Sequence, residues 1–272
     1  MLAAAAAEDV ILTTRTPEAL ASFAARGAAV RRADFAEPRT LSAAFAGAER
    51  MLLVSATDLA TRTAQHRAAI DAANAAGVRH VIYTSGLRPE RPNPAAVAAS
   101  HYATEQALAQ SGMAWTVLRN SLYADYQLPE AERALHAGVL VHNRGRGAVA
   151  YVAREDCAAA AAAVLLGDGH DGAVYDITGS EAFTADDLAA LYAELGGRPV
   201  RAQALDDAAF VAALGGGATG DDHLRYGANL VASFGRSIRE GYMSACTDHV
   251  AILTERPPRS LRQTLAPLRA TR

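Results

Sequence analysis

The stretch VILTTRTPEALASFAARGAAVRRADF, residues 10–35, decides the fold. A short β-branched run, Val10–Thr14, precedes an alanine-rich segment, and a second such run, Ala29–Arg32, follows it. Thr16-Pro17-Glu18 is typical of a helix start with Thr16 as the cap, and Gly27 is typical of a helix end. A strand, a helix and a second strand in this order predict a βαβ unit of a parallel sheet.

The same alternation continues to about residue 120 and then loosens. We expect two longer helices over residues 61–76 and 96–110, each ended by a glycine, and a glycine-rich loop over Gly215–Gly220 between helical segments. This pattern predicts an α/β fold, a Rossmann-like doubly wound parallel sheet with a small C-terminal lobe. Further strands are expected at Met51–Ser55, His80–Thr84, Trp115–Leu118 and Gly172–Ile177, and helix caps at Thr184 and Ser260.

Composition limits the functional classes. The 272 residues carry a net charge of −3, which argues against a nucleic-acid partner. All 26 basic residues are arginine, so neither a Schiff-base lysine nor a Tyr-x-x-x-Lys pair exists. Cys157 and Cys246 are too few for a disulfide framework or a metal cluster, and we expect both to be buried, reduced thiols. No segment resembles a leader or a membrane span, so we expect a cytoplasmic protein without a membrane partner.

A dinucleotide-binding sheet ordinarily opens with a strand, a glycine-rich turn and a helix whose N-terminus receives the pyrophosphate. That first βα unit is absent here, because Met1-Leu2 and the five alanines that follow resemble the end of its helix. Three explanations stand: a start placed too late, a protein that has given up its cofactor, or a different fold. Without the unit, we expect two neighbouring strands with unpaired edges and weak dinucleotide binding by these residues alone.

Six short motifs occur along the chain in a fixed order. They are Thr14-Arg15-Thr16-Pro17, Arg32-Ala33-Asp34-Phe35, Leu52-Leu53-Val54-Ser55, Tyr83-Thr84-Ser85, His101-x-x-Thr104-Glu105 and Leu118-Arg119-Asn120-x-x-Tyr123. Their order and spacing resemble the NmrA-like, atypical branch of the short-chain dehydrogenase/reductases, and most of all its bacterial NAD(P)H:quinone oxidoreductase type. The resemblance covers nearly all of the chain. It implies an NAD(P)-binding domain over residues 1–125 and a segment, 126–272, that completes the sheet and forms the substrate lobe.

The expected cofactor residues follow the strands. Arg15 follows the first strand of the chain, where an arginine accommodates the 2′-phosphate of NADP, so we expect NADPH, with NAD as the alternative. A solvated arginine at a helix start is the other explanation of Arg15. The resemblance implies that Asp34 and Phe35 lie beside the adenine; a turn acid and a core aromatic would explain them equally well. Ser55, Ala56 and Thr57 have small side chains that would let the backbone approach the ribose. Tyr83, Thr84 and Ser85 end the next strand, where Ser85 could bind a substrate carbonyl or simply form a turn.

The expected catalytic residues are His101, Asn120 and Tyr123. Tyr102 lacks the lysine that would lower its pKa, since Gln106 stands four residues later. A His101–Glu105 pair on one helix face could hold the imidazole protonated, although a structural surface pair has the same spacing. The resemblance implies that Asn120 donates to the carboxamide or a quinone oxygen, and that Tyr123 with Tyr126 stacks on a planar ring.

These residues predict an NADPH-dependent reductase that transfers hydride to a planar acceptor such as a quinone or a similar conjugated carbonyl. The same residues would serve an NmrA-type redox sensor that binds NADP or NAD without turnover. A third alternative is a tailoring enzyme that acts on an aromatic, polyketide-like substrate. A homodimer and a monomer both stay open.

Overall fold

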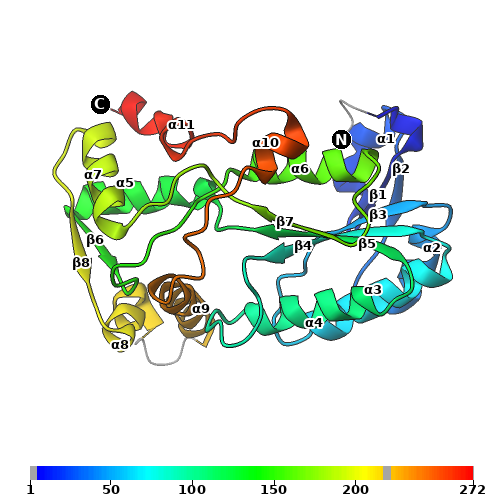
Figure 1. The fold of residues 1–272 in the computed structure, drawn as a ribbon, viewed down its shortest axis with the longest axis horizontal. Helices are drawn as coiled ribbons and strands as arrows, with labels where there is room; N and C mark the ends of the chain where they lie inside the picture. The colour runs from blue at the N-terminus through cyan, green and yellow to red at the C-terminus, as the bar shows by residue number, and fades with distance from the viewer. Residues whose placement is uncertain (1–4, 217–221, 272) are drawn as a thin grey trace. The chain divides into compact units, whose positions relative to one another are not determined.

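The computed structural model describes residues 5–216 and 222–271 (Figure 1). Most of the segment Met1–Ala7, which was expected to end a helix, therefore lies outside the described residues. Most of the Gly215–Gly220 loop also lies outside them. Ala5 and Ala6 are not helical, and a single 3-10 turn covers Ala7–Asp9. Among the described residues, no helix is long and apolar enough to cross a bilayer.

The chain forms two compact units, each assembled from several segments. Unit 1 contains the described residues up to Ser85, together with Ser100–Leu118 and Ala161–Tyr175. Unit 2 contains Gly86–Ala99, Arg119–Ala160 and the described residues from Asp176 onward. The expected division into domains 1–125 and 126–272 stays a prediction.

The sheet strands of unit 1 lie in two sets, one with the order β3-β4-β5-β7 and the other with β1 beside β2. The pairs β1–β2 and β3–β4 are parallel, with Leu12 opposite Val30 and Leu52 opposite Ile82. Within the described residues β1 pairs only with β2, and β3 only with β4, so each keeps one unpaired edge, as expected. The strands are β1 (Ile11–Thr14), β2 (Ala29–Arg32), β3 (Arg50–Leu53), β4 (His80–Gly86), β5 (Ala114–Asn120) and β7 (Ala173–Ile177).

Helices cover both faces of this sheet, which is the doubly wound arrangement. Figure 1 shows α3 (Arg62–Ala75) and α4 (Ala98–Ala109) on one side and, on the other, the part of α6 (Arg154–Leu166) that belongs to unit 1. Two short helices, α1 (Ala21–Ala24) and α2 (Leu41–Phe45), complete the unit. Its apolar core consists mainly of Leu41, Phe45, Leu53, Ala69, Ile70, Ala73, Val81, Tyr83 and Leu108.

The sequence predicted the bounds of most of these strands and helices correctly. The strand Ala29–Arg32 is observed as expected, and α3 begins and ends within one residue of the expected 61–76. Gly27, Gly77 and Gly112 all have positive φ, as a left-handed helix end requires.

The expected cap at Thr16 is wrong. Its side chain makes no capping bond, and the segment begins as a 3-10 turn over Pro17–Leu20. The backbone carbonyl of Thr16 already accepts from the N–H of Ala19 at 3.0 Å, while its own N–H donates to Thr14 Oγ1 at 3.2 Å. Thr16 has φ −124° and ψ 83°, outside the extended conformation of the capping residues Thr184 and Ser260, and its hydroxyl does not cap the turn.

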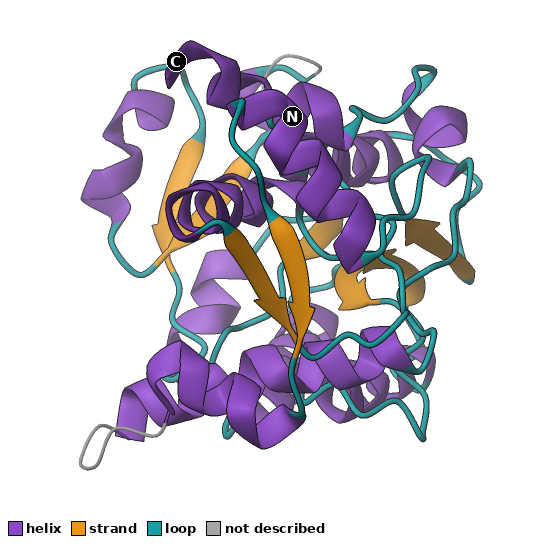
Figure 2. Cartoon of the chain, turned by 90° about the vertical axis from the view of Figure 1, so that its left-hand side faces the viewer, coloured by secondary structure: helices purple, strands orange, loops and turns teal. Residues whose placement is uncertain are grey.

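Unit 2 is built on a parallel pair, β6 (Val139–His142) and β8 (Arg201–Ala204), which Figure 2 shows among helices. The predicted caps are confirmed, since Thr184 and Ser260 both form capping boxes. A separate apolar core includes Leu140, Tyr151, Leu188, Tyr192 and Ile238. Its helices are α5 (Gln127–Ala137), α7 (Ala185–Gly196), α8 (Asp207–Val211), α9 (Asp222–Arg239), α10 (His249–Thr254) and α11 (Leu261–Thr264).

Two glycines of α9 should respond oppositely to replacement by alanine. A Cβ on Gly235 would lie 1.6 Å from Oδ1 of the buried Asn143, so we expect Gly235→Ala to destabilise the fold by about 2 kcal/mol. A Cβ on Gly227 meets nothing within 4 Å, so Gly227→Ala should stabilise the helix by about 1 kcal/mol. Urea unfolding of both variants measures the difference, and equal effects would contradict this packing.

The two cysteines differ in exposure. Cys157 is buried, and burial raises the pKa of its thiol to about 12. Cys246 is exposed, so the expectation that both are buried is wrong for this residue. It follows α9 in a loop, where its thiol lies 3.9 Å from the carbonyl oxygen of Ser244.

Candidate functional site

The candidate cofactor residues of unit 1 follow the carboxyl ends of its parallel strands, where open α/β sheets bind ligands. Arg15 comes directly after β1 and is exposed, and Asp34 and Phe35 follow β2 and are half-buried. Ser55–Thr57 follow β3, and Tyr83–Ser85 lie in the last residues of β4. The positions are those that the sequence indicated, and the roles of the residues stay predictions.

The loop after β3 is held by two side-chain hydrogen-bond acceptors, the half-buried Thr84 and the buried His66. The N–H of Ser55 donates to Thr84 Oγ1 at 2.9 Å, and the N–H of Ala56 donates to His66 Nε2 at 2.9 Å. Thr57 is exposed. Because two consecutive amides are fixed, the backbone that was expected to approach the ribose has a defined conformation.

Beneath this loop, His66 of α3 and His101 of α4 meet at Tyr83, whose side chain is fully buried. Tyr83 Oη lies 2.8 Å from His101 Nδ1 and 3.5 Å from His66 Nδ1. Arg62, also buried, places Nη1 3.4 Å from His101 Nε2. His66 Nδ1 is 2.9 Å from Thr104 Oγ1. The cluster therefore joins one strand and two helices through polar contacts.

Of the two alternatives for His101 and Glu105, the one in which Glu105 holds the imidazole protonated is contradicted. Burial, and then the positive charge of Arg62, lower the pKa of His101 to about 3. Burial likewise raises the pKa of Tyr83 well above its ordinary range. At neutral pH both side chains are neutral, so His101 can accept or donate a hydrogen bond but does not supply a positive charge.

Ser85 and Glu105 form a second polar contact in unit 1. Both side chains are buried, and Ser85 Oγ donates to Glu105 Oε1 at 2.6 Å. The hydroxyl expected to bind a substrate carbonyl is thus engaged with a carboxylate. A hydroxyl that donates its proton in this way can still accept a hydrogen bond through its oxygen.

Asp34 and Phe35 have structural contacts of their own. The N–H of Ala36 donates to Asp34 Oδ1 at 2.9 Å, which closes a turn after β2. Phe35 packs on the core of unit 1, and its ring stands edge-on to His66, with centroids 6.3 Å apart. These contacts match the alternative of a turn acid and a core aromatic, and the adenine role stays a prediction.

The residues expected to bind the acceptor and the carboxamide, Asn120, Tyr123 and Tyr126, lie in unit 2. Asn120 Nδ2 donates to the Tyr123 hydroxyl at 3.5 Å, while its Oδ1 is buried and has no hydrogen-bond partner among the described residues. The rings of Tyr123 and Tyr126 are tilted by 40° with centroids 6.0 Å apart, and Tyr126 is 62% exposed. Burial raises the pKa of Tyr123, so this hydroxyl is not a poised acid near neutral pH.

The sequence profile of the NAD(P)H-binding family matches residues 1–168. The chain belongs to this NAD(P)H-binding family. Its resemblance to NmrA-like proteins of the quinone oxidoreductase type is also confirmed, as is the Rossmann-like fold. The explanation that invoked a different fold is therefore wrong.

Three comparisons describe the relatives of this NAD(P)H-binding chain. Quinone oxidoreductase 2 of Escherichia coli is 40% identical over 208 residues, which make up 76% of this chain and 72% of that protein. The crystal structure of the NADPH-dependent quinone oxidoreductase from E. coli with NADPH matches with a TM-score of 0.92 and 34% identity, over 98% of this chain and 93% of that one. The Citrobacter sp. triphenylmethane reductase with NADP(H) matches with a TM-score of 0.88 and 30% identity, over 98% and 93%.

Each unit contains a residue whose chemistry suits one part of a nicotinamide dinucleotide. The exposed guanidinium of Arg15 suits a 2′-phosphate, and the unpartnered Oδ1 of Asn120 suits an amide donor such as a carboxamide. A glycine-rich strand-to-helix turn, which would hold the pyrophosphate, is not among the described residues. The described residues also contain no group of three or more metal-ligating side chains.

Sequence reasoning missed His66, Arg62 and Thr104. Arg62 and His66 lie four residues apart on the buried face of α3, in register with Ala69, Ile70 and Ala73. A histidine and an arginine at apolar positions of an alanine-rich helix are the signal that could have revealed them, because buried polar groups require partners. Their partners on other elements could not be read from that pattern.

Proposed function

We propose that this protein is an NADPH-dependent reductase that transfers hydride to a quinone or a similar planar conjugated acceptor. The observation that carries the proposal is the likeness, over 98% of the chain, to an NADPH-bound quinone oxidoreductase. NADPH supplies the hydride when bound. The protein supplies orientation, through the loop after β3, and a pair of tyrosine rings, Tyr123 and Tyr126, that suits a flat acceptor.

The acid–base chemistry of the site favours a quinone over an ordinary ketone. The chain has no lysine, burial raises the pKa of Tyr83 and Tyr123, and His101 is neutral. None of these groups is poised to protonate a ketone oxygen near neutral pH. A quinone accepts hydride readily, so hydrogen bonds and positioning suffice. Asn120 and Tyr123 are the groups we assign to the acceptor, and His101 to the support of Tyr83.

The test is NADPH oxidation with a panel of quinones, planar dyes and simple ketones. Oxidation that depends on quinones or planar dyes, but not on ketones, would support the reductase. Tight NADPH binding without turnover would favour the redox sensor instead, and turnover restricted to polyketide-like aromatics would favour the tailoring enzyme. A homodimer and a cytoplasmic location stay predictions.

Arg15 should decide the preference for NADPH. We expect Arg15→Ala to raise KM for NADPH about tenfold, the size of one charged hydrogen bond, and to leave KM for NADH unchanged. Arg39→Ala is the matched control, since Arg39 lies in the same unit and its side chain is 87% exposed. Equal changes with NADH and NADPH would show that Arg15 does not contact the 2′-phosphate.

A further inference from the structure

His66 contacts residues that lie in, or just after, three different strands. Its ring is edge-on to Phe35, which follows β2, and to Tyr83 of β4, with centroids 6.3 Å and 5.4 Å away. Its Nε2 accepts the N–H of Ala56, which follows β3. The side chain is fully buried, and its polar contacts with Ala56, Thr104 and Tyr83 all lie within unit 1.

Hydrogen-bond directions fix the tautomer of this ring. Thr104 Oγ1 donates its proton to the carbonyl of Ser100 at 2.8 Å, so the hydroxyl oxygen accepts from His66 Nδ1–H at 2.9 Å. The neutral ring has a proton on only one of its two nitrogens, and that nitrogen is Nδ1. Nε2 is therefore an acceptor, as the N–H of Ala56 requires.

We infer that His66 is a positioning residue for the cofactor, because it fixes the loop Ser55–Thr57 from beneath through the Ala56 amide. The inference rests on the proposed function, in which this loop contacts the ribose. Thr84 fixes the neighbouring amide of Ser55, but it lies on β4 itself. His66 is the link between the loop and the helices α3 and α4, since Thr104 orients it.

The first experiment compares His66→Leu, which removes the acceptor, with His66→Gln, whose side-chain oxygen can still accept from Ala56. We expect His66→Leu to raise both Kd and KM for NADPH about tenfold, the equivalent of one hydrogen bond. The kcat at saturating NADPH and KM for the quinone should stay within about twofold. His66→Gln should restore most of the affinity. Exchange of the Ala56 amide with solvent, followed by NMR, should accelerate in His66→Leu only.

His80→Leu is the matched control. His80 Nε2 also binds a threonine hydroxyl in unit 1, Thr116 Oγ1 at 2.8 Å, but it lies at the amino end of β4. A merely structural role for His66 would lower the stability of His66→Leu without changing KM for NADPH in the folded protein. That result, or an equal rise in KM for His80→Leu, would overturn the inference.

The outcomes also separate the inference from the proposed function. If the native protein binds NADPH but reduces no acceptor, the reductase proposal fails, while weaker binding by His66→Leu still supports the positioning role. Turnover with quinones and unchanged NADPH binding in His66→Leu would support the reductase and overturn the role of His66. A native protein that does not bind NADPH would overturn both.

Discussion

We expect the free energy of unfolding to fall by about 3 kcal/mol through His66 alone as the pH is lowered from 6.5 to about 4. Burial, and then the charge of Arg62, lower the pKa of His66 to about 4 in the folded protein. An unfolded chain takes up this proton near pH 6.5. Between these values the unfolded state binds more protons, so acid favours unfolding. The stabilisation is complete above pH 6.5 and is lost as the pH approaches 4.

His101 extends this acid-sensitive range, because burial and Arg62 lower its pKa to about 3. Urea unfolding at a series of pH values measures the effect, and NMR titration of the imidazole protons assigns it to the two rings. Carboxylates also contribute to acid unfolding, so the informative comparison is with a His66→Gln, His101→Gln double variant. That variant should lose most of the slope between pH 6.5 and 4. Identical slopes would contradict the neutral buried cluster.

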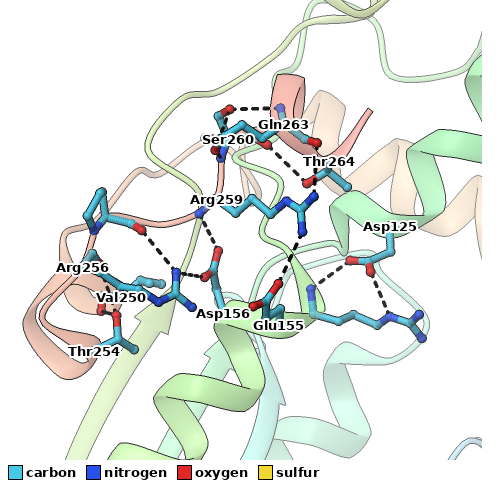
Figure 3. A network of polar contacts seen from close by, with 12 residues as sticks. Asp125, Glu155, Asp156, Val250, Thr254, Arg256, Arg259, Ser260, Gln263 and Thr264 are labelled. Carbon is cyan, nitrogen blue, oxygen red and sulfur yellow. Dashed lines mark hydrogen bonds and ion pairs between the residues drawn. The ribbon is translucent and has the colours of Figure 1, made fainter. Parts of the chain in front are cut away.

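The second large effect should come from Asp156, which ties the C-terminal tail of unit 2 to the start of α6 (Figure 3). Its side chain is only 1% exposed. Oδ2 accepts the backbone N–H of Arg259 at 2.7 Å, and Oδ1 lies 2.7 Å from Nη1 of Arg256. We expect Asp156→Ala to destabilise the protein by about 3 kcal/mol, because the Arg259 N–H loses a buried carboxylate acceptor and the exposed Arg256 loses its ion-pair partner.

A second ion pair provides the control for Asp156. Arg262 and Glu194 join the tail to α7 of the same unit, but their side chains are 49% and 56% exposed. Glu194→Ala should therefore cost less than about 1 kcal/mol. Asp156→Asn should lie between the two, since it keeps an acceptor for the Arg259 N–H and loses the charge. Chemical unfolding measures the stability of the three variants. A similar loss of stability for Asp156→Ala and Glu194→Ala would contradict the role given to the buried Asp156 carboxylate.

The sequence by itself determined most of the elements of unit 1 and their order. Alternating β-branched and alanine-rich runs predicted the strands and helices of the parallel sheet, because the period of apolar residues is local information. Gly27, Gly77 and Gly112 marked helix ends because few other residues tolerate positive φ. The Thr184 and Ser260 caps were readable because their partners lie three residues away. The ends of the strands then indicated where cofactor residues should lie.

Only the tertiary structure decided the partners and charge states of those residues. His101 was expected to pair with Glu105 four residues away, yet it is neutral because it is buried beside Tyr83 and Arg62. The sequence suggested no role for His66. Its proposed role follows from its hydrogen bonds to Ala56 and Thr104, which lie on other elements. Burial and long-range contacts set pKa values and tautomers, and neither follows from spacing along a single helix.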